Sequence, residues 1–230
     1  MMKLKKMQKV LLSTAVCFIL TTSTLYAAAD RKPVELNANT VEYDTQTGLI
    51  TATGSVKMIQ DGAVLTGASA QYNSKTQEGF VTGGVVVDKE DMHMTAAMIK
   101  TAGANHMIAT GNVVAVKADK TLTGPQIDYY PDTSYAVIES DARVTMTDGT
   151  FTSDRMEAYL NENRLIGTGN VHIVSPPRNL DAVGDQAVYY GKDDGKVVLT
   201  GNAVATQNNN TLRSNKLTIY LAGGKADVTT

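Results

Sequence analysis

The stretch Leu65–Tyr72, with the sequence LTGASAQY, is one copy of an eight-residue pattern that returns about every 29 residues. The pattern reads apolar, any, small, any, any, apolar, any, and then Tyr or a small residue. Seven copies align, at intervals of 29, 29, 28, 29, 32 and 29 residues, and they start at Leu36, Leu65, Met94, Leu122, Phe151, Val183 and Leu212. Such a period indicates one structural unit stacked repeatedly on copies of itself.

Within the pattern, the apolar and small positions predict a bent strand. Leu65 and Gly67 are two residues apart, as are Ala70 and Tyr72, so each pair shares one face of a strand. The step of three between the pairs would reverse the face of a straight strand, whereas a bulge at the centre keeps all four side chains together. A small residue before that break suits a close approach of two backbones, and the residues at this position are Ala38, Gly67, Ala96, Gly124, Ser153, Asp185 and Ser214.

A second strand-like segment follows each pattern. In Leu49–Met58 the apolar and polar residues alternate, which is the period of a strand with one wet face. This segment carries a Thr-Gly-x-Val step whose glycine slot holds Gly54, Gly83, Gly111, Gly169 and Gly201, with Ala142 in one unit. Short turn signals such as Asp61-Gly62 separate the segments, so sequential strands should be antiparallel. We therefore expect an all-β, elongated and folded-over sheet of about seven two-strand units, whose halves face each other across an apolar interior.

The first 29 residues are typical of a secretory signal. Lys3, Lys5, Lys6 and Lys9 precede an apolar core over 10–20, and the run Ala27–Ala29 predicts cleavage after Ala29. A retained membrane anchor is the alternative, although the apolar run ends at Thr21, short of the ~20 residues that span a bilayer. We expect a signal over 1–29 and one domain over 30–230. Since the only cysteine, Cys17, lies in the signal, the mature chain suits an oxidising compartment.

Charge and composition argue against several classes of function. Without the four signal lysines, 17 basic residues remain of 21 against 23 acidic ones, a net charge of −6, which disfavours nucleic-acid binding. His93, His106 and His172 lack metal-ligand spacing, and the acidic run Asp88–Asp91 lacks the order of a calcium loop. No nucleophile or nucleotide motif occurs either. We expect no enzyme, cofactor or metal site.

The repeated steps resemble those of the OstA-like (LptA) family of lipopolysaccharide-transport proteins. The resemblance is carried by 33–38 (PVELNA), 53–56 (TGSV), 110–113 (TGNV), 168–171 (TGNV) and 199–203 (LTGNA). It implies a β-jellyroll and a non-enzymatic periplasmic carrier that bridges the inner and outer membranes. The implied partners are lipopolysaccharide, an inner-membrane LptC-like protein, an outer-membrane LptD-like protein and further copies of the chain. An anchored LptC-like component, the amino-terminal domain of the outer-membrane partner, and a ligand-free structural or adhesive β-solenoid remain alternatives.

For a carrier, burial of acyl chains must supply the binding energy. At ~0.8 kcal/mol per methylene, a chain of about a dozen carbons gains on the order of 10 kcal/mol before entropic costs. The expected groove lining is Val34, Leu36, Tyr43, Val56, Leu65, Tyr72, Val85, Val113, Leu122, Tyr129, Val144, Val171 and Tyr190. An open sheet also exposes its two terminal strands to strand addition by partners. The residues expected at these docking edges are Val34, Leu36, Leu212, Leu217 and Ile219.

Overall fold

The computed structural model describes residues 34–60, 62–103, 105–191, 195–221 and 227–229. The predicted signal over 1–29 and its cleavage site lie outside the described residues. No described helix has the length and apolar character needed to cross a membrane.

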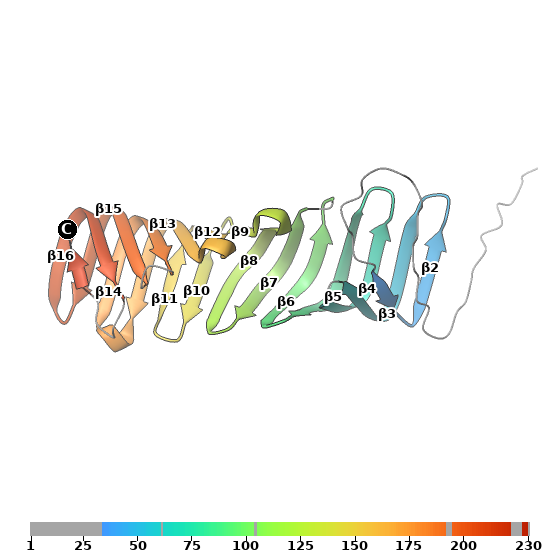
Figure 1. Cartoon of the computed structure of the whole chain (residues 1–230), viewed down its shortest axis with the longest axis horizontal. Helices are drawn as coiled ribbons and strands as arrows, with labels where there is room; N and C mark the ends of the chain where they lie inside the picture. The colour runs from blue at the N-terminus through green and yellow to red at the C-terminus, as the bar shows by residue number, and fades with distance from the viewer. Residues whose placement is uncertain (1–33, 61, 104, 192–194, 222–226, 230) are drawn as a thin grey trace, which may run out of the picture.

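All described strands belong to one 17-stranded antiparallel sheet, which runs as a long ribbon from one end of the molecule to the other (Figure 1). This confirms the expected all-β architecture of sequential antiparallel strands. Three single-turn 3₁₀ segments interrupt it: η1 (Pro131–Thr133), η2 (Leu160–Glu162) and η3 (Pro176–Arg178). The strands are β1 (Glu35–Asn37), β2 (Thr40–Asp44), β3 (Leu49–Gln60), β4 (Ala63–Asn73), β5 (Glu78–Lys89), β6 (Met92–Thr101), β7 (Met107–Lys117), β8 (Lys120–Tyr130), β9 (Tyr135–Ile138), β10 (Ala142–Met146), β11 (Gly149–Ser153), β12 (Arg155–Tyr159), β13 (Arg164–Ser175), β14 (Leu180–Tyr190), β15 (Lys196–Gln207), β16 (Asn210–Tyr220) and β17 (Asp227–Thr229).

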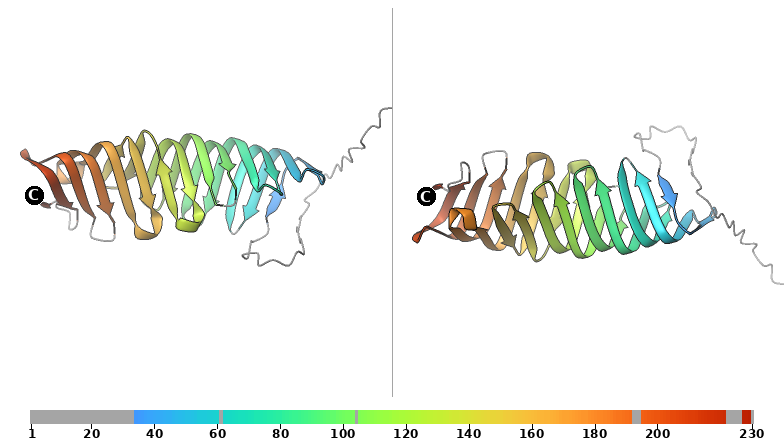
Figure 2. Two further views of the ribbon diagram at one scale, coloured as in Figure 1. Left: turned by 90° about the horizontal axis from the view of Figure 1, so that it is seen from above. Right: turned by 90° about the horizontal axis from the view of Figure 1, so that it is seen from below.

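The sheet is folded lengthwise along a line of bends. Each long strand pairs in two stretches separated by a register shift, for example between Thr53 and Val56 in the pairing of β3 with β4. The stretches on either side of the bends form two half-sheets, which lie over one another in the views from above and below (Figure 2). We call them half-sheet 1, which contains 49–53 and its neighbours, and half-sheet 2, which contains 56–60 and its neighbours. Their free margins are rim 1, with connections such as 74–77, and rim 2, with connections such as 90–91 and 176–179.

Glycine at the bend has a specific steric reason. Gly83 and Gly111 have φ of +88° and +84°, a region that other residues rarely adopt. A Cβ on Gly111 would lie 2.5 Å from the Cβ of Ala97, and one on Gly83 would lie 2.4 Å from that of Ala68. These two bends therefore require both the left-handed backbone and the absence of a side chain, which explains the Gly of the Thr-Gly-x-Val step there.

The core fills the angle between the half-sheets. Val56, Val85, Val113 and Val171 follow the bends, and each is 1% exposed. Their side chains join one continuous cluster of buried apolar residues that extends from Ala52 to Ile219. Val144, also buried, belongs to this cluster. This packing explains why apolar and polar residues alternate along the strands, because the apolar ones face the core and the polar ones face outward.

Two unit alignments from the sequence are wrong. In the sixth unit, β14 turns Ala182 inward (0% exposed) and leaves Val183 39% exposed, so the pattern starts one residue earlier than expected. The 32-residue interval concealed this shift. In the fourth unit, Val144 pairs with Leu122 as Ala115 does, so Val144 is the equivalent of Ala115. Ala142, two residues earlier, is therefore the equivalent of Val113, and it occupies the valine position of the Thr-Gly-x-Val step instead of the glycine position. Asp141, at φ +52°, takes the left-handed position of the bend instead.

Candidate functional site

The candidate site is the inner face of the folded sheet together with the mouth, the opening between rim 1 and rim 2. Near the bends, the inner side chains are fully buried. Towards the rims, a second set of apolar side chains packs on this core but remains partly exposed; it includes Leu36, Met58, Leu65, Met92, Met94, Met107, Ala115, Leu122 and Tyr129. Five methionines, including Met146, lie in this partly exposed set. Methionine is flexible and polarizable, so it adapts to apolar partners of varied shape.

Most of the residues expected to line a groove share this inner face. Leu36, Leu65, Leu122 and Tyr129 belong to the partly exposed set, and Val56, Val85, Val113, Val144 and Val171 to the buried core. Tyr72 lies two residues from buried Ala70 and so faces the same side. Tyr43 pairs with Ile50 on this face but is 38% exposed, because β2 lies at the end of the sheet.

One expected lining residue, Tyr190, is wrongly placed, and another, Val34, precedes the first strand. Tyr190 pairs with Lys196, whose ammonium lies 5.3 Å from the ring centroid, and both belong to the outer face. Tyr189 takes the inner position and packs against the core. The cause is the one-residue shift in this unit, because a slip of one reverses every side chain. Val34 precedes β1 and is 38% exposed, so it lies outside any strand.

The mouth is closed at the carboxyl-terminal end by the Arg178 clasp, which consists of Arg178 and the groups it binds. Arg178 lies at rim 2, in the turn between β13 and β14, and its side chain is 10% exposed. Its Nη1 donates to the Asp148 carboxylate and, at 3.0 Å, to the Ser175 hydroxyl oxygen. Its Nη2 donates to the Leu221 carbonyl at rim 1, over 2.8 Å. The clasp thus ties the two rims together.

Inner side chains are more deeply buried near the Arg178 clasp than at equivalent positions nearer the amino terminus. At rim 2 beside Arg178, Ser175 and Leu180 are 4% and 2% exposed, whereas the corresponding Met92 of β6 is partly exposed. In half-sheet 1, Val197 and Ile219 are likewise buried, whereas Met107 and Tyr129 at the equivalent positions are not. The inner face is therefore more accessible in the amino-terminal part of the sheet than near the clasp.

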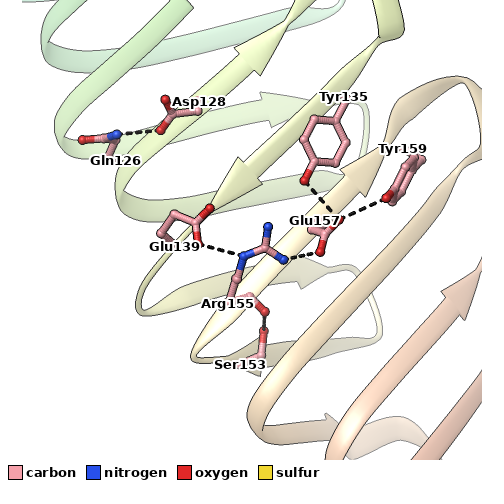
Figure 3. Close-up of polar contacts among 8 residues, drawn as sticks. All are labelled: Gln126, Asp128, Tyr135, Glu139, Ser153, Arg155, Glu157 and Tyr159. Atoms are coloured by element: carbon pink, nitrogen blue, oxygen red, sulfur yellow. Dashed lines mark hydrogen bonds and ion pairs between the residues drawn. The ribbon is translucent and has the colours of Figure 1, made fainter.

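The outer face carries a polar cluster near the middle of the chain (Figure 3). Glu157 accepts hydrogen bonds from the hydroxyls of Tyr135 and Tyr159, both at 3.0 Å, and from Arg155. Arg155 also donates to Glu139, at 2.7 Å. Burial raises the pKa of Glu157, but the hydrogen bonds from Arg155 and the two tyrosines outweigh it and leave that pKa below its ordinary value. Burial and Glu157 raise the pKa of Tyr135 to about 12.

This cluster is a structural feature of the fourth bend. Glu139 precedes the bend that lacks glycine, and the strand is interrupted there between β9 and β10. Nearby, the Ser153 hydroxyl donates to the Arg155 carbonyl at 2.8 Å, and Gln126 donates to Asp128 at 2.6 Å (Figure 3). All charged members of the Glu157 group have a partner, and no nucleophile is poised among them. In the described ranges, no group of three or more metal-ligating side chains converges.

The terminal strands differ from the expectation. The first bent strand is split into β1 and β2, both of which pair with β3. Among the described residues, the strand registers pair β1 and β2 with β3 alone, so their other side is an edge. At the other end, β17 covers β16 at Thr218–Tyr220, which leaves the 210–217 part of β16 as the open edge. Leu212 is 39% exposed there, whereas Leu217 and Ile219 are fully buried and face the interior.

Comparison with protein families gives a match over most of the chain. The family described as "LptA/(LptD N-terminal domain) LPS transport protein" matches residues 34–164 and, again, residues 101–225. Two overlapping matches are expected when a repetitive sheet is longer than the family pattern, because the pattern can align in more than one register.

Among solved structures, one match is the crystal structure of LptH from Pseudomonas aeruginosa, described as the LptA-homologous periplasmic component of the lipopolysaccharide transport device. It is 16% identical, covers 64% of this chain and 98% of that chain, and has a TM-score of 0.35. Among curated proteins, none matches the chain. Because the family match extends over most of the chain, the protein belongs to the LptA/(LptD N-terminal domain) family of LPS transport proteins.

Proposed function

We propose that this protein is a periplasmic carrier that shields the acyl chains of lipopolysaccharide on its inner face during transport from the inner to the outer membrane. Family membership supports the pathway. The observation that carries the finer proposal is the set of apolar side chains between core and rims, which stays partly exposed along the amino-terminal part of the sheet. An acyl chain laid on this set would lose contact with water at about 25 cal/mol per Å² of apolar surface buried.

A photo-crosslinking experiment tests the carrier proposal. A photoreactive amino acid is placed at Leu65 or Leu122, which face inward, and at Thr66 or Thr123, their neighbours on the outer face. We expect lipopolysaccharide to be captured from the two leucine positions and not from the threonine positions. Equal capture from both faces would overturn the proposal, since adjacent residues differ only in the face that they present.

A self-filled structural solenoid is a second candidate, and one observation favours it. Near the clasp, side chains such as Leu199 and Leu217 are fully buried by the protein itself and are not available to a ligand. Absence of capture at every inward position would support this candidate. Capture confined to the amino-terminal part would instead support a carrier with a closed carboxyl-terminal end.

The open edges suggest how a carrier of this type joins its neighbours. Strand addition at the β1–β2 edge and at the 210–217 edge of β16 would extend the sheet, and with it the apolar inner face, into another protein. The two edges are unlike, so contact between copies would be head-to-tail and could continue as a filament. We propose an inner-membrane LptC-like partner at the first edge and an outer-membrane LptD-like partner at the last.

A further inference from the structure

Three lysines, with Met92 between the first two, form a row on the inner side of rim 2. In the strand register Lys89 pairs with Met92, Met92 pairs with Lys117, and Lys117 pairs with Lys120. Lys89 lies two residues from buried Val87, and Lys117 lies four from buried Val113, so both share the inner face. Neighbouring strands are ~4.8 Å apart, so the row covers about 14 Å along the rim.

The lysine row stands directly above accessible apolar side chains. The next inward row along the same strands contains Met94, Ala115 and Leu122, paired in register with one another. These three residues are partly exposed and pack on the core. A line of cations above an apolar strip is complementary to an amphiphile with an anionic head and apolar chains.

The contacts of Lys117 and Lys120 leave room for such a head group. Lys117 lies 4.0 Å from Asp91, and Lys120 lies 3.3 Å from Asp119. The side chains of Lys117 and Asp91 are 65% and 55% exposed, and those of Lys120 and Asp119 are 38% and 57% exposed. Exposed pairs of this kind are worth only about 0.2–1 kcal/mol, so a phosphate can compete with these carboxylates.

Lys120 also shares the inner face, because it lies two residues from Leu122, which packs on the core. The electrostatics of Tyr189, an inner-face residue of β14 in half-sheet 1, agree with this position. Burial raises the pKa of Tyr189, the charge on Lys120 opposes that rise, and the charges on Asp148 and Asp119 add to it.

We propose that Lys89, Lys117 and Lys120 bind the phosphate groups of an amphipathic lipid whose acyl chains rest on Met94, Ala115 and Leu122. This inference rests on the proposed carrier function and assigns the part of the site that holds the head group. It also accounts for recognition of an anionic lipid by a chain of net charge −2, because the three lysines lie together on the inner side of the rim, although the turns beside them carry Asp91 and Asp119.

The test compares two triple variants with the same change of charge. One carries Lys89→Gln, Lys117→Gln and Lys120→Gln, and the control carries Lys57→Gln, Lys100→Gln and Lys216→Gln on the outer face. Equilibrium binding to the full chain is measured at ~0.15 M salt with diphosphorylated lipid A, with the same lipid lacking phosphates, and with phosphatidylglycerol.

We expect the rim variant to lose about fivefold or more in affinity for diphosphorylated lipid A, as for the loss of a few exposed ion pairs. Its affinity for the dephosphorylated lipid should not change, and the control should match the wild type. A similar loss with phosphatidylglycerol would show that the row binds phosphate on any lipid; no loss would restrict it to the phosphorylated glycolipid.

Equal affinities of the rim variant and the control for diphosphorylated lipid A would overturn the proposal. A failure of the carrier function can be told apart from this outcome. In that case the wild type would bind none of the three lipids, and a crosslinker at Leu122 would capture no lipid. Binding of the phosphorylated and dephosphorylated lipids with equal affinity would refute the lysine row and leave the carrier intact.

Discussion

Arg178 and Leu221 are 43 residues apart in sequence but are joined across the mouth, where the Arg178 guanidinium donates to the Leu221 carbonyl at 2.8 Å. The same side chain holds Asp148 and Ser175 on its own rim. Arginine can serve all three acceptors at once because its guanidinium presents five donors in a rigid plane. The hydrogen bond thus closes one end of an otherwise open fold.

Removing the Arg178 clasp should loosen that end. We expect Arg178→Ala to lower the free energy of unfolding by about 1–3 kcal/mol, since it leaves partly buried acceptors without a donor. Hydrogen exchange should accelerate around 175–180 and 217–221 while the amino-terminal strands stay protected, because repeat stability is largely local. Arg213→Ala, a change of an exposed arginine on β16, is the control. Unchanged exchange at both rims would show that the clasp does not hold the mouth shut.

The bend glycines allow a matched test of close approach. Gly111 and Gly103 both have positive φ, at +84° and +74°, but only Gly111 would place a Cβ against a neighbour, 2.5 Å from the Cβ of Ala97. Gly103→Ala should cost about 1 kcal/mol for the left-handed backbone alone. Gly111→Ala should cost more, by a further ~1–3 kcal/mol of overpacking, in urea unfolding. Equal costs would mean that backbone conformation alone selects glycine at the bend.

Glu157 should make stability depend on pH. Hydrogen bonds hold its pKa below the ordinary value of 4.5 in the folded protein. The stabilisation from this group is therefore present above pH ~4.5 and is lost as the pH falls through the lowered folded pKa. In Glu157→Gln this part of the acid dependence should disappear, whereas Glu42→Gln, an exposed control on β2, should retain it. Acid unfolding curves of the three proteins that coincide in shape would contradict this assignment.

The repeat pattern was sufficient to predict the fold. The spacing of Leu65, Gly67, Ala70 and Tyr72 correctly indicated a bent strand with one apolar face, whereas the bend at the Gly-x step of the second segment, which was expected to alternate regularly, is seen only in the structure. The sixth unit failed because insertion of Pro176 and Pro177 changed the interval, and the motif was aligned on Val183 when Ala182 is the residue turned inward. A comparison of Gly184 with Gly124, each a small residue before a bend, would have corrected the phase.

Other features depend on contacts that no local pattern encodes. Arg178 lies within the 32-residue interval that departs from the usual period, but its partner Leu221 is reached only when the sheet folds over. The lysine row likewise joins residues beside two different turns, 90–91 and 118–119, and it emerges only from the strand register. The pairing of β17 with the last long strand, which closes part of that edge, could not be anticipated either, whereas the inward position of Leu217 and Ile219 follows from the repeat pattern.

The open edge of β16 offers a test of strand addition. Asn208 and Asn209, at φ +47° and +66°, form a two-residue hairpin turn between Gln207 and Asn210. Residues that flank such a turn form a hydrogen-bonded pair. Along the two strands, hydrogen-bonded pairs alternate with pairs that are not hydrogen-bonded, so the N–H groups of every second residue are directed to the partner strand. The N–H of Asn210 and that of Leu212 are therefore directed to β15, whereas that of Arg213 is directed to the open edge.

Arg213→Pro should accordingly remove a donor from the edge without breaking a hydrogen bond to β15. We expect the variant to fold, with a circular dichroism spectrum like that of the wild type, and to lose head-to-tail association and binding of the outer-membrane partner. Arg213→Ala removes the same side chain but keeps the N–H, so it should associate normally. If the two variants associate equally well, the partner does not add a strand at this edge, and the contact must be made by side chains alone.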